Sequence, residues 1–248
     1  MGLEGREAAT VLGHVAYAYY LKHRDVPFDV VDISELYEQA LEFDPNNTFA
    51  NTMYGHWIIF RDRDADRAAP HFEVALKDQA KREWVRGMQL TAHINMVRRG
   101  SGSDSPEMMK LRLALLSAAC DMRANEEPLP EQEKCKEILL CYGKSYRGRG
   151  EFVEYHVEHL DPVTQLPMVR WLDESIKYQG LNLANQVRYV IARLTEATGG
   201  SDEANSMYRK LASDDTVNRE LILRIDESIE RITGETSTRL RQSREREH

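Results

Sequence analysis

The chain has 248 residues, of which 42% are hydrophobic and 30% charged, and its formal net charge is −8 at pH 7. This length and composition are typical of a soluble protein with one large domain or two small ones, and the acidic balance argues against general affinity for nucleic acids or anionic membranes. The N-terminal residues MGLEGREAAT lack the basic and apolar regions of a signal peptide, and no apolar run approaches the roughly 20 residues of a membrane span, so we expect a cytoplasmic protein.

Strand-like alternation of Val, Ile and Thr is nearly absent, which predicts an all-α fold. Apolar positions recur three and four residues apart, the spacing of one helix face, in segments of about 10–20 residues. We expect about twelve helices. The breaks between them fall at residues 23–29, 44–47, 61–64, 98–106, 125–130, 147–150, 161–162, 179–182, 198–202 and 213–215. Because the connections are short, neighbouring helices should be antiparallel and form hairpins.

Local signals mark several helix ends. Ser105, Pro106 and Glu107 place a capping hydroxyl before a first-turn proline and an early acid, which predicts a helix start. The residues before Pro45 and Pro162 are biased away from helical conformation, so helices should end there. One further helix, over roughly 165–179, disturbs a regular pairing of helices into hairpins.

One short pattern occurs twice. The stretches YEQAL (37–41) and FEVAL (72–76) place Tyr37 and Phe72, and also Ala40 and Ala75, 35 residues apart. An alanine there lets two helices approach closely, and the aromatic ring fills the gap to the next hairpin. Before each stretch lies an apolar-Gly-His sequence, in VLGHVAY (11–17) and MYGHWII (53–59). A period near 34 residues with these features indicates a repeated helical hairpin.

These stretches resemble the tetratricopeptide repeat, whose consensus runs Trp-x-x-Leu-Gly-x-x-Tyr, Ala-x-x-x-Phe-x-x-Ala and then Pro. The matching residues are Leu12, Gly13, Tyr37, Ala40 and Pro45 in the first copy, Tyr54, Gly55, Ile58, Ala68, Phe72 and Ala75 in the second, Trp84 in a third, and Ala192, Ala204, Tyr208 and Leu211 further on. The first copy departs from the consensus by about eight extra loop residues, the third has Met88 at the glycine place, and residues 105–180 show helices without the consensus.

The resemblance implies a right-handed α-solenoid of antiparallel helical hairpins. Residues 1–124 would hold N-terminal repeats, residues 125–236 degenerate repeats that continue the solenoid, and residues 237–248 a charged tail, either a fraying helix end or a disordered extension. In such repeats the first helices line a concave groove, and the residue after the glycine faces it. The implied groove residues are Thr10, His14, Tyr17, Thr52, His56, Ile59, Gln89 and His93.

This groove predicts a non-catalytic scaffold or adaptor that binds a peptide, a helix or a partner domain. Chaperone-binding members of the family clamp a C-terminal carboxylate with Lys and Asn, and Thr10, His14, Thr52 and His56 do not reproduce that clamp. Two alternatives remain open: a regulatory or sensor segment of a larger multidomain protein, and a helical enzyme or RNA-binding protein. For RNA, the stretch KSYRGRG sets Lys144, Arg147 and Arg149 beside tyrosines, a basic and aromatic combination in an otherwise acidic chain.

Enzymatic and metal sites find little support. Nucleotide-binding loops, nucleophile elbows and dinucleotide fingerprints are all missing from the sequence. His156 and His159 do not have the spacing of a metalloprotease, and we expect them on a solvated helix face. His14 and His56 lack further ligands for zinc, so we expect no metal and no cofactor. The three cysteines, Cys120, Cys135 and Cys141, form no CxxC motif and should be reduced, buried thiols.

Overall fold

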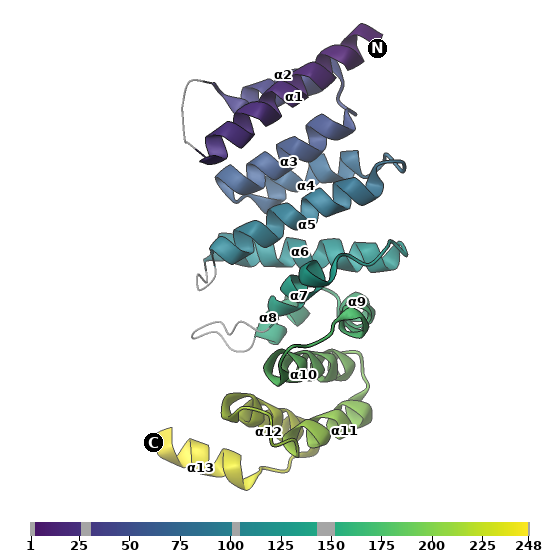
Figure 1. Ribbon diagram of the computed structural model, residues 1–248. Helices are drawn as coiled ribbons and strands as arrows, with labels where there is room; N and C mark the ends of the chain where they lie inside the picture. The colour runs from purple at the N-terminus through teal and green to yellow at the C-terminus, as the bar shows by residue number, and fades with distance from the viewer. Residues whose placement is uncertain (1–2, 26–30, 101–104, 143–151, 248) are drawn as a thin grey trace. The chain divides into compact units, whose positions relative to one another are not determined.

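The computed structural model describes residues 3–25, 31–100, 105–142 and 152–247, which form thirteen helices and no strand (Figure 1). The all-α prediction is therefore confirmed for these residues, with one helix more than expected. None of the described helices has an apolar stretch of the kind that a membrane crossing requires. The chain divides into two compact units, Met1–Ala118 and Ala119–His248.

Unit 1 is built on helical pairs. Its helices are α1 (Leu3–Asp25), α2 (Ile33–Phe43), α3 (Thr48–Asp62), α4 (Ala65–Ala75), α5 (Arg82–Arg99) and most of α6 (Pro106–Ala124). Helix α1 packs along α2, and α3 packs along α4, to which Arg63 and Asp64 alone connect it (Figure 1). Helix α3 also contacts α1 and α5, so it lies between them in the centre of the unit.

The interior of unit 1 holds the aromatic and alanine positions of the repeated pattern. Tyr37, Ala40 and Ala75 are completely buried, and Phe72 is 1% exposed. The ring of Phe72 lies against α3 at Gly55, where an added Cβ would come within 3.0 Å of two ring carbons. The expectation that these residues pack between helices is therefore confirmed. The arrangement of hairpins as a solenoid of tetratricopeptide repeats stays a prediction.

Unit 2 contains the remaining helices, α7 (Gln132–Leu140), α8 (Phe152–His159), α9 (Pro162–Ser175), α10 (Leu181–Ala197), α11 (Ser201–Ala212), α12 (Arg219–Thr233) and α13 (Thr238–Glu247). Helix α10 contacts both α9 and α11, and α12 packs on α11. Met168, Leu172, Tyr208 and Ile225 are completely buried in the core of this unit. The further helix expected over 165–179 is α9.

The predicted helix ends follow the local capping chemistry. Helix α2 ends at Phe43, two residues before Pro45. Ser105 Oγ accepts a hydrogen bond from the backbone N–H of Met108 at 3.3 Å, at the start of α6. Asp161 caps α9 by accepting from the N–H of Val163 at 3.0 Å. These boundaries are confirmed, because each depends on residues within one turn of the helix end.

The C-terminal tail is more ordered than expected. It forms helix α13, whose Leu240 is 2% exposed. Ser237 Oγ donates to Asp226 Oδ2 of α12 at 2.7 Å, and Arg239 Nε lies 3.2 Å from the same oxygen. Helix α13 is therefore attached through Leu240 and through the buried carboxylate of Asp226. The charged composition of the tail gave no indication of this attachment.

His156 also differs from expectation. It is completely buried, whereas we expected it on a solvated face. Its Nε2 lies 3.5 Å from the carbonyl oxygen of Cys141, and its ring meets that of Tyr142 edge-on at 5.0 Å between centroids. His159, three residues on, is exposed as expected. Helix α8 thus turns His156 inward, where the flat imidazole ring packs against Tyr142.

Candidate protein-interaction face

Three helices of unit 1 surround a hollow of about 170 Å³. Its lining residues include Tyr17 and Tyr20 of α1, His56 and Phe60 of α3, and Met88 and Arg99 of α5. On each helix the lining positions recur every three or four residues along one side, as Met53, His56 and Phe60 on α3 illustrate. The hollow is therefore the place where one stripe from each of α1, α3 and α5 meets.

Aromatic packing fixes the walls of this hollow. The Tyr20 hydroxyl is hydrogen-bonded to His56 Nδ1 at 2.9 Å. The Tyr20 ring also packs against Trp57 and Phe60, with centroid distances of 5.4 and 5.2 Å. Arg99 places its guanidinium over the Phe60 ring, 5.1 Å from the centroid. Among the lining residues that the structure describes, Arg99 is the one permanently charged side chain.

A stack of aromatic rings continues the hollow along the same helices. His14 lies face to face with Phe49 at 4.0 Å and 2°, and Phe49 stacks in turn on Trp84 at 5.9 Å and 8°. Tyr17, which lines the hollow, meets Phe49 edge-on at 5.9 Å. His14 is exposed, and Trp84 keeps 39% of its surface exposed. We call His14, Tyr17, Phe49 and Trp84, together with the hollow, the aromatic face.

The aromatic face unites three of the predicted groove residues, His14, Tyr17 and His56. Thr10 is exposed one turn before His14 on α1, and its hydroxyl donates to the carbonyl of Arg6 at 2.8 Å. We did not predict that Phe49, Phe60 and Trp84 would belong to this face. The signal was available for Phe49, because it precedes His56 by seven residues and two helical turns return to the same face.

The structure buries four residues that we expected to face the groove, among them His56, which lines the hollow but keeps only 7% of its surface exposed. Thr52 and Ile59 are completely buried, and His93 is 2% exposed. Thr52 Oγ1 donates to the carbonyl of Thr48 at 2.7 Å, which satisfies its hydroxyl within α3. Burial lowers the pKa of His93, although its contact with the Gln89 carbonyl opposes the shift. The expected exposure of these residues is corrected accordingly.

Two physical reasons explain the difference. Helix α3 has neighbours on both sides, so residues flanking the narrow strip of Met53, His56 and Phe60 are covered. On α5 the expected register was shifted by one residue, because Met88 was placed at the glycine position. If Gly87 takes that position, Met88 falls in the hollow, as it does in the structure. Gln89, the residue after Met88, is half-buried and accepts from Arg86 at 2.9 Å.

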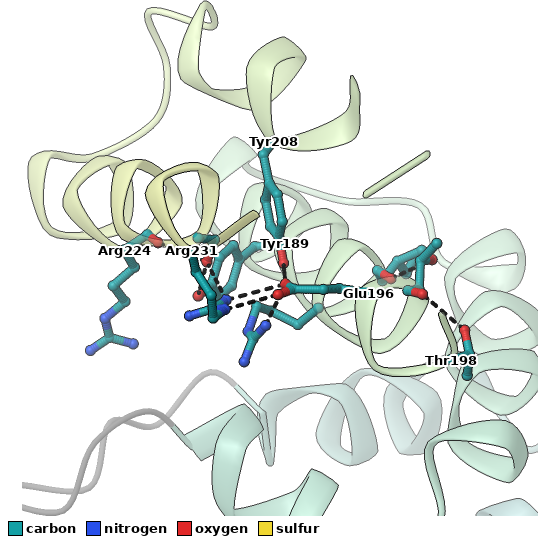
Figure 2. A network of polar contacts seen from close by, with 10 residues as sticks. Tyr189, Glu196, Thr198, Tyr208, Arg224 and Arg231 are labelled. Carbon is teal, nitrogen blue, oxygen red and sulfur yellow. Dashed lines mark hydrogen bonds and ion pairs between the residues drawn. The ribbon is translucent and has the colours of Figure 1, made fainter. Parts of the chain in front are cut away.

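Unit 2 contains a charged cluster around Glu196 of α10, shown in Figure 2. Arg231 of α12 donates from Nε to Glu196 Oε1 at 2.8 Å, and the hydroxyl of Tyr208 of α11 donates to Oε2 at 2.9 Å. Arg193 donates to Oε2 at 2.5 Å. Burial alone would raise the pKa of Glu196, but the Arg231 hydrogen bond and the Arg193 charge outweigh it and hold the pKa below its ordinary value. Both carboxylate oxygens are occupied, so we interpret the cluster as a link between three helices.

Other candidate sites give no converging chemistry. The basic stretch with Lys144, Arg147 and Arg149 lies outside the described residues. A wider hollow of about 530 Å³ in unit 2 is lined by side chains of mixed charge, among them Glu133 and Lys136. In the described ranges, no group of three or more His, Cys, Asp or Glu residues is placed to hold a metal ion.

The cysteines are buried, and none forms a disulfide. Burial raises the pKa of Cys120 to about 12 and also raises that of Cys135. Both thiols are therefore protonated at neutral pH, and the protonated form is a poor nucleophile. The prediction that the three thiols are buried is confirmed.

Comparisons of the chain with known protein families, with curated proteins and with solved structures gave no match. The functional interpretation therefore depends on the geometry and chemistry of the aromatic face.

Proposed function

We propose that the chain is a non-catalytic interaction protein and that the aromatic face of unit 1 binds a segment of another polypeptide. The observation that supports this most is the stack of exposed His14, half-buried Phe49 and exposed Trp84, which leads through Tyr17 into the hollow. Aromatic residues, Met and Arg are enriched at protein interfaces, and buried aromatic and Arg side chains dominate binding energy. The face supplies all of these types.

The size of the hollow favours a polypeptide over a small molecule. Its volume of about 170 Å³ is below the roughly 300–1,000 Å³ of ligand pockets. It suits one apolar side chain, while the rest of the bound segment lies across the exposed rings. Methionine is flexible, so Met88 and Met53 can adjust to anchors of different shape.

Charge gives the bound segment a second property. Arg99 lines the hollow, its side chain is exposed, and its guanidinium carbon lies over the Phe60 ring. A carboxylate close to the apolar anchor would pair with it, since arginine binds carboxylates with two parallel hydrogen bonds. The proposed ligand is therefore a segment with one large apolar residue followed or preceded by an acidic one.

The scaffold role includes the solenoid arrangement as part of the same proposal. Support comes from the contacts of α3 with both α1 and α5, and from the buried aromatic and alanine positions of α2 and α4. Packed helices hold the aromatic face in its binding geometry beforehand, so the protein itself loses little conformational entropy when a segment docks.

A displayed library of random linear peptides tests the proposal without knowledge of the natural partner. We expect selection against the whole chain to enrich peptides with an apolar anchor near an acidic residue. Met88→Arg, which places a charge in the hollow, should weaken the enriched peptides by about 100-fold or more, as loss of a binding hot spot does. Arg99→Ala should weaken those that carry the acid by about tenfold.

Two controls make the result interpretable. Val163→Arg introduces the same charge at a 65%-exposed position of unit 2 and should leave peptide affinity unchanged. A triple alanine variant of Lys144, Arg147 and Arg149 should also bind normally. The proposal fails if no peptide is enriched, or if enriched peptides bind the Met88→Arg chain as tightly as the parent. Loss of binding only in the triple variant would favour the basic stretch instead.

A further inference from the structure

Helix α1 has an apolar stripe on the side that faces away from the rest of unit 1. Its inner side carries Ala9, Ala16 and Tyr20, all at most 4% exposed. On the outer side Val11 and Val15 keep 62% and 38% of their surface exposed. Two exposed β-branched apolar residues one turn apart on a charged protein's surface suggest a surface that is covered in the assembled state.

The outer stripe has the spacing of a coiled-coil seam. Its residues are Glu4, Ala8, Val11, Val15, Ala18 and Lys22, separated by four, three, four, three and four residues. Apolar residues at this alternation form the contact line of paired helices. Ala8 is half-buried and the other five are exposed. At 1.5 Å per residue the stripe extends for about 27 Å along the helix, nearly three heptads.

The same stripe is complementary to itself in reverse. Around position 13 its residues are ordered Glu, Ala, Val on one side and Val, Ala, Lys on the other, at equal distances from the centre. An antiparallel copy of α1 would therefore place Val11 against Val15, Ala8 against Ala18 and Glu4 against Lys22. A parallel copy would instead bring Glu4 to Glu4 and Lys22 to Lys22, which like charges disfavour.

We propose that α1 is a dimer interface, in which the stripe pairs with the same stripe of a second copy of this chain in antiparallel orientation. One two-fold axis then relates the copies, as in most homodimers, and each contact occurs twice. The alanines let the helix axes approach closely, and the four valines of the two copies are removed from water. The two end ion pairs are exposed, so they set direction and register more than affinity.

This proposal is independent of peptide binding. Tyr17 lies on another side of α1 from Val11 and Val15, whereas His14, three residues after Val11, borders the stripe. A dimer through the stripe leaves the hollow of each copy open and holds two hollows in one assembly. A ligand with two docking segments would then bind more tightly than either segment alone.

Charge exchange is the sharpest test. By analytical ultracentrifugation, the parent chain should pass from 28.6 kDa toward twice that mass as its concentration rises. Glu4→Lys alone and Lys22→Glu alone each turn two attractive contacts into repulsive ones, and should raise the dimer dissociation constant by about tenfold. The double variant Glu4→Lys with Lys22→Glu restores opposite charges and should return the constant to the parent value. Circular dichroism verifies that each variant is folded.

Cross-linking tests orientation. Chains with Val11→Cys and chains with Val15→Cys are mixed and oxidised with copper phenanthroline, and the mixed disulfide should form faster than either chain links to itself. Val11→Arg should abolish dimers, while Val163→Arg, at a similarly exposed valine, should not. A parent chain that stays at 28.6 kDa at every concentration overturns the proposal. So does faster self-linking of the Val11→Cys chain, which indicates parallel pairing, or a charge-exchanged double variant that remains monomeric.

Discussion

The contact between Gly55 and Phe72 supports a prediction about protein stability. Gly55→Ala should destabilise the parent chain but stabilise a chain that already carries Phe72→Ala. Phe72 is 1% exposed, and its ring occupies the space beside α3 where a side chain at residue 55 would begin. Phe72→Ala removes a buried ring and leaves a cavity, at a cost of about 3–5 kcal/mol in the free energy of unfolding. Because Gly55 has no side chain to fill the space, we expect a value in the upper half of that range.

Gly55→Ala has two opposing effects in the parent chain. It replaces glycine inside α3 by the best helix former, a gain of about 1 kcal/mol. Its Cβ, however, would lie 3.0 Å from two carbons of the Phe72 ring, which is 1% exposed. Such overpacking costs about 1–3 kcal/mol, so the net effect should be a loss of stability. In the Phe72→Ala background the clash is gone and the methyl group fills part of the cavity. There Gly55→Ala should stabilise the protein by about 1 kcal/mol or more.

The assay is a double-mutant cycle by urea unfolding, followed by tryptophan fluorescence in chains that all carry Trp171→Phe. The remaining tryptophans, Trp57 and Trp84, both lie in unit 1, so the signal reports that unit. Additive effects of the two substitutions would refute the reasoning, as would stabilisation of the parent chain by Gly55→Ala. Either result would mean that the Phe72 ring does not lie against residue 55.

Three further predictions concern unit 2. Glu196→Gln should cost about 1–3 kcal/mol, because the charges of its arginine partners lose their counter-charge. The pKa of Glu196 is lowered from 4.5 in the folded state, so the stabilisation by its charge is present above pH 4.5 and is lost on acidification. The urea midpoints of the parent and the variant should therefore converge as the pH falls below 4.5. Cys120, with a pKa of about 12, should react with iodoacetamide at pH 8 only in denaturant, as mass spectrometry can show. Leu240→Ala should cost about 2 kcal/mol and expose the α13 amides to hydrogen exchange, whereas Leu181→Ala, at a 54%-exposed position, should change neither.

Helix boundaries and interior positions were predictable because their causes are local. A capping hydroxyl or carboxylate such as Ser105 or Asp161 acts within one turn, and the spacing of Tyr37 and Ala40 places both on one helix face. Neither inference requires knowledge of what lies next to the helix. The all-α class and most helix ends could therefore be predicted from the sequence.

The binding face was only partly predictable because it depends on neighbours. Periodicity groups Thr52, His56 and Ile59 near one side of α3, but it does not show that α1 and α5 cover both edges of that side. The open strip is narrow, and Phe60 takes the place that Ile59 was expected to occupy. The exposure of His156 was predicted wrongly for a related reason, because its environment includes Tyr142, which lies fourteen residues earlier in the sequence.

The carboxylate of Glu196 also determines how unit 2 comes apart. It receives hydrogen bonds from Tyr208 of α11 and Arg231 of α12, while it belongs to α10 itself. If any one of these helices unfolds, the carboxylate loses a partner while the remaining charges stay in a poorly hydrated site, which is unfavourable. Partial opening is therefore suppressed, and the three helices should open as one cooperative segment with a common free energy of amide exchange. The segment from Leu181 to Thr233 should therefore open and close as one unit.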